Sequence, residues 1–183
     1  GKGVLLSSIS EERNSKVTVI GCGEVGKSSI HKSIQVGASV TAIDLNENIL
    51  KDLKNKYGEN IRTLLSGTDE AVSAIRSADL VIGAVLLPGR KPPTVITEED
   101  IKYMEKGTVI IDVAIDQGGC VEGVSPNTHS DPFEIRNGVI VSAIANLPGA
   151  VPRTSSMELS TNLQNYVDNL LVENWFEKYK NNE

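Results

Sequence analysis

Short apolar, β-branched runs alternate with amphipathic segments along almost the whole chain. A strand is predicted where about four to eight such residues lie together, and a helix where apolar residues recur at helical spacing. Six strands are predicted: Lys16–Ile20, Ser39–Ile43, Ile61–Leu65, Leu80–Leu87, Thr108–Val113 and Val139–Ala143. Five helices are predicted: Val25–Val36, Asn46–Tyr57, Asp69–Ser77, Thr97–Glu105 and a tail from about 156 to 179.

This alternation favours a doubly wound α/β fold. Strands separated by helices pair in parallel through right-handed crossovers. Six strands with this spacing fit a Rossmann-type parallel sheet, in the order 3-2-1-4-5-6, with helices on both faces. The long apolar runs LVIGAVLL and TVIIDVAI indicate strands that are covered on both faces. The segment from Gly118 to Asn137 is rich in Gly, Pro, Asn and Ser, so we expect a binding loop there.

The composition is typical of one soluble globular domain. The chain has 183 residues, of which 39% are hydrophobic and 23% charged, and its net charge is −6. This charge and the lack of a basic cluster argue against a nucleic-acid partner. The longest apolar run is too short to span a membrane, and the N-terminal residues do not resemble an export signal. Cys22 and Cys120 are therefore expected to be reduced thiols in the cytoplasm. No metal site is expected.

The stretch VIGCGEVGKSS, residues 19–29, fits two different phosphate-binding motifs. Gly21, Gly23 and Gly26 form G-x-G-x-x-G, the dinucleotide fingerprint, which places a pyrophosphate at a helix N-terminus. The same stretch also spells G-x-x-x-x-G-K-S, the Walker A loop of NTPases, in which Lys27 would hold a phosphate. The motif alone does not choose between the two ligands.

Asp44 favours the dinucleotide interpretation. The fingerprint calls for an acid about 20 residues on, at the end of the second strand, where it accepts hydrogen bonds from the adenosine ribose. Asp44 stands 18 residues after Gly26. Its charge would repel a 2′-phosphate, so NAD is favoured over NADP. The Walker interpretation gives Asp44 no role, although Asp112 would resemble a Walker B aspartate. Without a ligand, the glycines would form a plain turn and Asp44 would cap the next helix.

Glu24 is unusual in this motif, because a negative charge beside a pyrophosphate weakens binding. Either its side chain points away and favours the helix dipole, or Lys27 offsets its charge. The sequence does not decide between these two explanations.

Several stretches of the chain resemble the NAD-binding domain of the alanine dehydrogenase/pyridine nucleotide transhydrogenase family. The most specific are VAIDQGG and NLPGAVPRTS. The others are GKGVLL, KVTVIGCGEVG, ADLVIGAVLLPG and the segment around DPF, and together they cover nearly the whole chain in the family's order. The resemblance implies oxidative deamination of L-alanine to pyruvate and ammonia, with NAD as the hydride acceptor. Transhydrogenase members usually carry a glutamate where this chain has Asp116, which favours the alanine dehydrogenases.

The resemblance also implies a set of site residues. The three glycines would hold the pyrophosphate, with Glu24 and Val25 at the helix start. Asp44 would hold the adenosine ribose, and Asp116 would be the catalytic aspartate. The remaining contacts, from the adenine side to the nicotinamide side, would be Ser66, Val85, Leu86, Val113, Ala114, Ile115, Ile144, Ala145, Asn146 and Leu147.

Asp116 is also a plausible site residue on physical grounds. It follows an apolar strand, at the carboxyl end of the sheet where doubly wound folds bind ligands. A carboxylate there can relay a proton or orient a water molecule. The alternative is that Asp116 caps the Gly118-Gly119 turn. Asp112 lies within the strand pattern and is assigned a structural role.

Members of this family have a second domain, which supplies the substrate-binding arginine and lysine and the catalytic histidine. We expect residues 1–155 to form the NAD-binding domain and residues 156–183 to form a helix leading toward that absent domain. The chain alone is expected to bind NAD without converting L-alanine or pyruvate. A homo-oligomer, or a partner that supplies the missing half, is expected to cover the apolar docking side.

Three hypotheses on function remain open. The first is the cofactor half of an NAD-dependent alanine dehydrogenase. The second is a non-catalytic NAD-binding or regulatory module, or the NAD-binding part of a transhydrogenase subunit. The third and least favoured is a P-loop NTPase.

Overall fold

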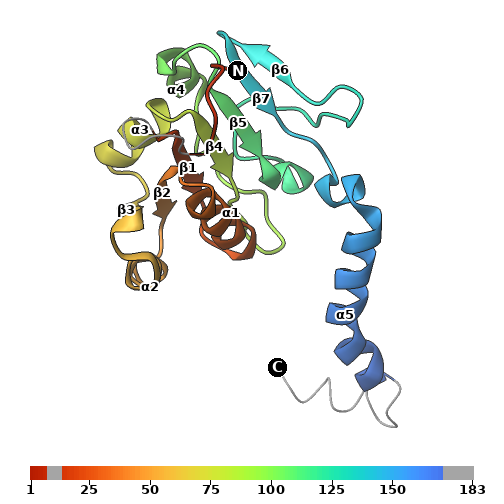
Figure 1. Ribbon diagram of the computed structural model, residues 1–183. Coiled ribbons are helices and arrows are strands. Elements are labelled where there is room, and N and C mark those ends of the chain that lie inside the picture. The colour runs from red at the N-terminus through yellow and green to blue at the C-terminus, as the bar shows by residue number, and fades with distance from the viewer. Residues whose placement is uncertain (8–13, 171–183) are drawn as a thin grey trace. The chain divides into compact units, whose positions relative to one another are not determined.

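Seven strands form one sheet in the first part of the chain (Figure 1). The computed structural model describes residues 1–7 and 14–170, and the chain divides into two compact units, residues 1–145 and 146–183. The strand order is β3-β2-β1-β4-β5-β7-β6. Their bounds are β1 Lys16–Ile20, β2 Ser39–Asp44, β3 Ile61–Leu65, β4 Leu80–Gly83, β5 Val109–Asp112, β6 Glu134–Arg136 and β7 Val139–Ser142. Because β7 is the predicted sixth strand and all pairs from β3 to β7 are parallel, the predicted order 3-2-1-4-5-6 is confirmed.

The additional strand, β6, pairs antiparallel with β7 at the edge of the sheet. Asn137 and Gly138 connect the two strands with φ values of 52° and 84°. Two successive left-handed residues are what a tight two-residue hairpin turn requires, and Asn-Gly is its strongest sequence signal. The segment after Gly118 is therefore a loop only as far as Phe133, and the longer loop expected up to Asn137 is wrong in its last part.

Helices cover both faces of the sheet, as predicted (Figure 1). On one face lie α1 (Glu24–Gln35) and α2 (Glu47–Tyr57), and on the other lie α3 (Asp69–Arg76) and α4 (Glu98–Tyr103). Successive residues of β1 show the two faces. Val17 and Val19 pack with Ile30 of α1, whereas Thr18 donates a hydrogen bond to the carbonyl of Ala74 in α3 at 3.0 Å.

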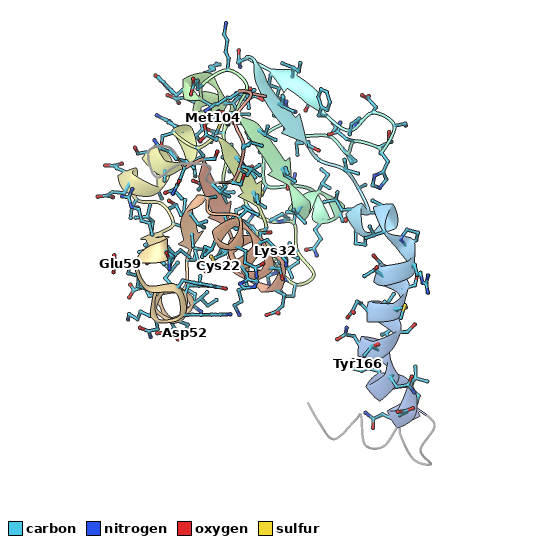
Figure 2. The ribbon with its side chains drawn as sticks, in the orientation of Figure 1. Cys22, Lys32, Asp52, Glu59, Met104 and Tyr166 are labelled. Atoms are coloured by element: carbon cyan, nitrogen blue, oxygen red, sulfur yellow. The ribbon has the colours of Figure 1, made fainter. Side chains whose placement is uncertain are left out.

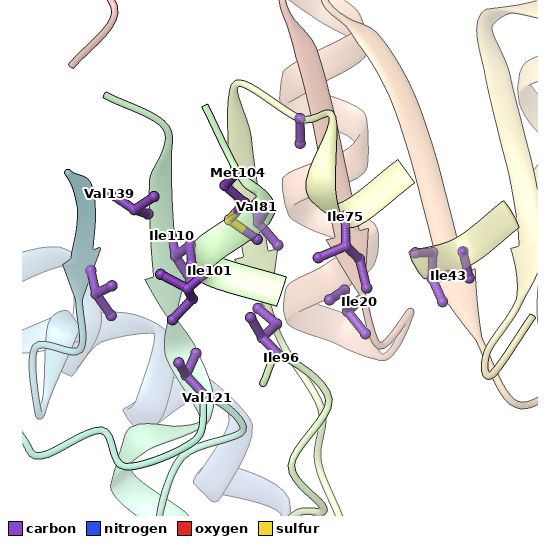
Figure 3. Close-up of a cluster of buried hydrophobic side chains, with 13 residues drawn as sticks. Ile20, Ile43, Ile75, Val81, Ile96, Ile101, Met104, Ile110, Val121 and Val139 are labelled. Atoms are coloured by element: carbon purple, nitrogen blue, oxygen red, sulfur yellow. The ribbon is translucent and has the colours of Figure 1, made fainter. Parts of the chain in front are cut away.

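The core lies in two clusters, one on each face of the sheet. Figure 3 shows the cluster beneath α3 and α4, in which Ile75 and Ile101 pack against Val81 and Ile110 of the central strands. In the other cluster, Ile30 of α1 and Leu53 of α2 cover β1 and β2. Burial on both faces is the physical reason for the continuous apolar runs in the sequence.

Side chains cap three of these four helices. Asn46 accepts from the Asn48 amide at the start of α2, and Thr68 accepts from the Ala71 amide at the start of α3. At α4, Thr97 and Asp100 form a reciprocal capping box. The residue at the start of α1 is Gly23, which has no side chain to cap it. The first N–H groups of α1 are therefore open to an external acceptor.

Two predicted strands end earlier than their apolar runs. The run Leu80–Leu87 forms a strand only as far as Gly83, because β1 ends at Ile20 and gives no further partner. Leu86 and Leu87 are exposed, so a fully buried strand over the whole run is wrong. Likewise β5 ends at Asp112, and Val113–Gln117 forms a 3₁₀ helix, η2.

The second unit begins with η3 (Leu147–Ala150) and continues as α5 (Pro152–Leu170). The predicted tail helix therefore starts four residues earlier than 156, and its expected part beyond 170 lies outside the described residues. α5 exposes Leu159, Leu163, Tyr166 and Leu170, at alternating spacings of four and three residues (Tyr166 is labelled in Figure 2). Among the described residues, no helix is both long and apolar enough to cross a membrane.

Candidate functional site

The glycine turn between β1 and α1 has two glycines that the protein's own packing requires and one that it does not. Gly21 has a φ of 87°, and a Cβ there would lie 2.7 Å from the Ala84 carbonyl oxygen. A Cβ on Gly26 would lie 1.9 Å from the Gly21 carbonyl oxygen. A Cβ on Gly23 would meet no atom within 4 Å. The open space is therefore above Gly23, beside the uncapped start of α1, where a phosphate group can approach the backbone.

Asp44 reaches this turn from the end of β2. One carboxylate oxygen, Oδ2, accepts from the backbone N–H of Cys22 at 2.6 Å, and Oδ1 accepts from the Asn46 amide at 2.8 Å. The Ser66 amide donates to the Asp44 carbonyl at 2.9 Å, which places Ser66 beside it at the end of β3. The structure thus brings these two predicted residues and the glycine turn together. Because Asn46 provides the cap of α2, Asp44 is not needed for that role.

Glu24 and Lys27 form an ion pair on the first turn of α1. The Glu24 side chain is 95% exposed, and its Oε1 lies 3.6 Å from the Lys27 ammonium. The Glu24 side chain thus extends into solvent beside a cation, and its effect on a bound pyrophosphate stays a prediction. An exposed pair of this kind stabilises the fold little. Val25 beside it is also exposed.

Cys22 lies beneath the turn with its side chain fully buried. Burial, with a further contribution from the Asp44 carboxylate, raises the pKa of the Cys22 thiol to about 12. The thiol is therefore neutral at physiological pH and adds no second negative charge beneath a bound phosphate. Cys22 and Cys120 are both free, as expected for reduced thiols.

The other half of the candidate site, across from the glycine turn and Asp44, lies at the carboxyl ends of β4 and β5. After β4, Val85 is half-buried against the core and Leu86 is exposed. The 3₁₀ helix η2 follows β5, and its residues run from half-buried Val113 through buried Ala114 and Ile115 to exposed Asp116. The carboxylate predicted to be catalytic thus lies on an accessible turn.

Asp112 supports the turn formed by η2 and the residues after it, which confirms the structural role assigned to Asp112. Its side chain is fully buried, and Oδ2 accepts from the amides of Cys120 and Val121 at 2.8 and 3.0 Å. Oδ1 accepts from the Ala114 amide at 3.0 Å and from the Cys120 thiol at 3.4 Å. One buried carboxylate therefore fixes both ends of the turn that carries Asp116.

Backbone carbonyls close the Gly118-Gly119 turn. The Gly118 amide donates to the Ile115 carbonyl at 2.9 Å, and the Gly119 amide donates to the Ala114 carbonyl at 3.1 Å. A capping carboxylate would need those same N–H groups. These two amides are thus paired within the backbone, and whether Asp116 acts as a cap of this turn or as a site residue stays a prediction.

These contacts disfavour a P-loop. A Walker B aspartate must face a bound magnesium ion, but Asp112 is buried and accepts four hydrogen bonds from the protein. Within residues 1–7 and 14–170, no group of three His, Cys, Asp or Glu side chains is placed to hold a metal ion.

Sequence reasoning missed the role of Asn127. Its Oδ1 accepts from the Ala143 amide at 2.8 Å, and its carbonyl accepts from the Ala145 amide at 3.2 Å. Asn127 thereby fixes half-buried Ile144 and Ala145, which follow β7 and belong to the predicted nicotinamide side. A Pro-Asn pair in a loop is its only sequence signal. The other two predicted residues of this group, Asn146 and Leu147, begin the second unit at η3.

The reversal of strand order between β1 and β4, with a glycine turn beside an acid on β2, defines a doubly wound α/β domain of the Rossmann type. Residues 1–183 match the family model described as "Alanine dehydrogenase/PNT, C-terminal domain". The chain belongs to this family, which confirms the resemblance found in the sequence.

Known relatives agree with this assignment. The chain is 48% identical to alanine dehydrogenase of Bacillus subtilis over 161 residues, which are 87% of this chain and 43% of that protein. It is 41% identical to alanine dehydrogenase 2 of Staphylococcus aureus over 184 residues, which span 100% of this chain and 50% of that protein. A solved structure of L-alanine dehydrogenase matches with a TM-score of 0.88 and 37% identity, over 95% of this chain and 48% of that one. The chain thus spans about half the length of these relatives.

Proposed function

We propose that this chain is the NAD-binding domain of an L-alanine dehydrogenase, which deaminates L-alanine to pyruvate and ammonia with hydride transfer to NAD. The observation that carries the proposal is the hydrogen bond from the Cys22 amide to Asp44, in a turn that leaves open space above Gly23. In a chain of this family, that pairing of a glycine turn and an acid fits adenosine ribose and pyrophosphate.

The described residues fit the two halves of the cofactor. The amides at the start of α1 would hold the pyrophosphate above Gly23, while Asp44 and Ser66 would hold the adenosine over β1 to β3. The nicotinamide half would then lie over β4 and β5, where η2 presents Val113–Ile115 and β7 leads into Ile144 and Ala145. NAD, when bound, supplies the hydride acceptor. Asp116 would hold or release a proton at its carboxylate, facing that half.

The other parts of this assignment concern the longer protein. We propose that L-alanine and pyruvate bind only when the substrate domain is present, so that the chain alone binds NAD without turnover. The apolar residues exposed on α5 support association with that domain or with a second copy. The free, buried cysteines support a cytoplasmic location.

Calorimetric titration of the chain with NAD, NADP and Mg-ATP tests the cofactor assignment. We expect NAD-selective binding, which Asp44→Ala and the milder Asp44→Asn weaken by at least about tenfold. Asp52→Ala, which removes an exposed acid on α2 (Figure 2), is the matched control and should bind as the wild type does. Magnesium-dependent ATP binding that is lost in Lys27→Ala would contradict the proposal and support an NTPase.

A kinetic assay separates the enzyme from a non-catalytic module. NADH formation from L-alanine is expected from a longer protein that carries this domain together with a substrate domain, and not from the chain alone. Asp116→Asn in that longer protein should abolish most of the activity at saturating NAD, although the variant still binds NAD. Normal turnover in this variant would remove Asp116 from the proposed mechanism.

A further inference from the structure

Lys91 lies flat across the turn that follows η2. A Cβ on Gly118 would meet three successive carbons of the Lys91 side chain, Cγ, Cδ and Cε, at 3.1, 3.2 and 3.2 Å. Gly118 also has a φ of 106°, which favours glycine. The lysine stem therefore occupies the space that a side chain at Gly118 would take, two residues after Asp116.

The segment that carries Lys91 is held at its two ends, first beside the glycine turn and then at Cys120. It leaves the sheet beside the glycine turn, where the Cα of Val85 lies 2.9 Å from the Cβ position of Gly21. It returns where the amides of Val95 and Ile96 donate to the Cys120 carbonyl at 2.8 and 3.3 Å. Lys91 is thus held between the glycine turn and the chain just beyond η2.

The charge of Lys91 lies close to this turn. The ammonium nitrogen is one covalent bond, about 1.5 Å, beyond Cε, so it lies within roughly 5 Å of the Gly118 Cβ position. Among the ion pairs of the described residues, none involves Lys91, whereas Lys27 at the glycine turn is paired with Glu24. Lys91 therefore places a cation that has no ion-pair partner among the described residues at the carboxyl end of β4 and β5.

This cation would face the nicotinamide half of the cofactor, an inference that rests on the proposed function. Asp44 on β2 fixes the adenosine over one half of the sheet, and the pyrophosphate spans the start of α1. The other half of an extended dinucleotide must then lie over β4 and β5, on the side of Lys91 and η2. The nicotinamide ring is positively charged when oxidised and neutral when reduced. A nearby ammonium repels only the oxidised ring.

We propose that Lys91 sets the relative affinity of the site for the two oxidation states of the cofactor, by weakening NAD⁺ relative to NADH. At the separations expected across such a turn, one cation changes this ratio by about three- to tenfold. The carboxylate of Asp116 on the same turn acts in the opposite direction, so the two charges together determine the preference.

Direct titration of the chain with NAD⁺ and with NADH at low salt tests this role. Lys91→Met keeps an unbranched stem across Gly118 and removes the charge, so the affinity ratio should move toward NAD⁺ by about three- to tenfold. Lys91→Arg keeps the charge and should restore a ratio close to that of the wild type. Lys106→Met is the matched control, because the Lys106 stem lies across Gly138 in the same way, with Cγ 2.8 Å from its Cβ position, at the amino end of the sheet.

The outcomes distinguish the inference from the function on which it rests. If the wild type binds both forms and Lys91→Met leaves their ratio unchanged, the inference is wrong and the cofactor assignment stands. If Lys91→Met weakens both forms equally, Lys91 acts through packing or phosphate binding and not through the ring charge, which also overturns the inference. If the wild type binds neither form, the proposed function fails and the inference fails with it.

Discussion

The carboxylate of Asp44 accepts a hydrogen bond from the backbone N–H of Cys22 at 2.6 Å. The residue at the end of β2 thereby holds the turn that follows β1. The other carboxylate oxygen accepts from the Asn46 amide at 2.8 Å. Because each oxygen can accept more than one hydrogen bond, both can still receive a ribose hydroxyl. Asp44 therefore supports the glycine turn and remains able to bind a ligand.

Gly23→Ala should separate ligand binding from folding. The new methyl group would project into open space, since no protein atom lies within 4 Å of that Cβ position. We expect the free energy of unfolding to change by less than about 1 kcal/mol. NAD affinity should fall by at least about tenfold, because the methyl group would occupy the space of the pyrophosphate. Calorimetry and thermal unfolding of the same sample measure both, and unchanged affinity would contradict the predicted pyrophosphate position.

Gly26→Ala should destabilise the protein itself. Its Cβ would lie 1.9 Å from the Gly21 carbonyl oxygen, so α1 must move away from β1. Overpacking of this kind costs about 2–3 kcal/mol. Urea unfolding measures the loss, with Gly23→Ala as the neighbouring control. Equal stability of the two variants would show that the close approach of α1 to the turn is not required.

Asp112→Asn should loosen the turn that carries Asp116. The Asn side chain has one acceptor oxygen and would point donors at the amides or thiol that Asp112 now accepts from. We expect a loss of about 3 kcal/mol in unfolding free energy. Asp116→Asn, which changes an exposed carboxylate on the same turn, should cost less than about 1 kcal/mol. Similar losses in both variants would argue against Asp112 as the support of the turn.

Both cysteines should resist alkylation in the native protein. Burial raises the pKa of the Cys22 thiol to about 12, and burial beside Asp112 also raises that of Cys120. Since the thiolate is the reactive form, labelling at pH 8 should be slow until the chain unfolds. A thiol reagent added with and without guanidinium chloride measures the two rates. Rapid labelling of one thiol in the native state would place that cysteine outside the buried core.

Asp100 should contribute to unfolding at acid pH. Burial opposes its ionisation, but hydrogen bonds from Thr97 and the Arg76 guanidinium outweigh this and hold the pKa of Asp100 below its usual value. The native state therefore gains stability above the unfolded pKa, near 3.9, and loses it as the pH falls through the lower native pKa.

Asp100→Asn should therefore flatten the fall in unfolding free energy below about pH 4. It should also cost about 1–2 kcal/mol at pH 7, because α4 loses part of its capping box. The measurement is denaturant unfolding at a series of pH values, with Asp52→Asn as the exposed control. A wild-type acid slope in Asp100→Asn would show that Asp100 does not contribute to it.

Much of the fold was predictable because local patterns and tertiary packing agree. α3 begins at Asp69 as predicted, α4 begins one residue after the predicted start at Thr97, and the strand order follows from alternating strands and helices. The exceptions are two strands, one whose length and one whose existence depend on a neighbouring segment of the chain. β4 stops at Gly83 because β1 offers no further partner, although its apolar run continues. β6 has three residues and depends on the Asn137-Gly138 turn, so its own pattern is too short to detect.

The part of the candidate site around the glycine turn was more predictable from the sequence than the part at the ends of β4, β5 and β7. The glycine turn and Asp44 form a motif with fixed spacing, and the structure places them in contact. Asn127 and Lys91 have no such signal, because their roles come from a hydrogen bond to Ala143 and a contact with Gly118, both far along the chain. The residues that bind NAD stay a prediction until the titrations are made.

The sequence by itself determined the strand and helix types, their parallel order, the cofactor class favoured by Asp44 and the family. These follow from periodicity, short-range capping and motif spacing, which are local properties of the chain. Only the tertiary structure decided where the strands stop, which glycine faces open space, and how Asp112 and Lys91 surround the turn that carries Asp116. Those features depend on contacts between residues distant in sequence, and such contacts exist only once the sheet has formed.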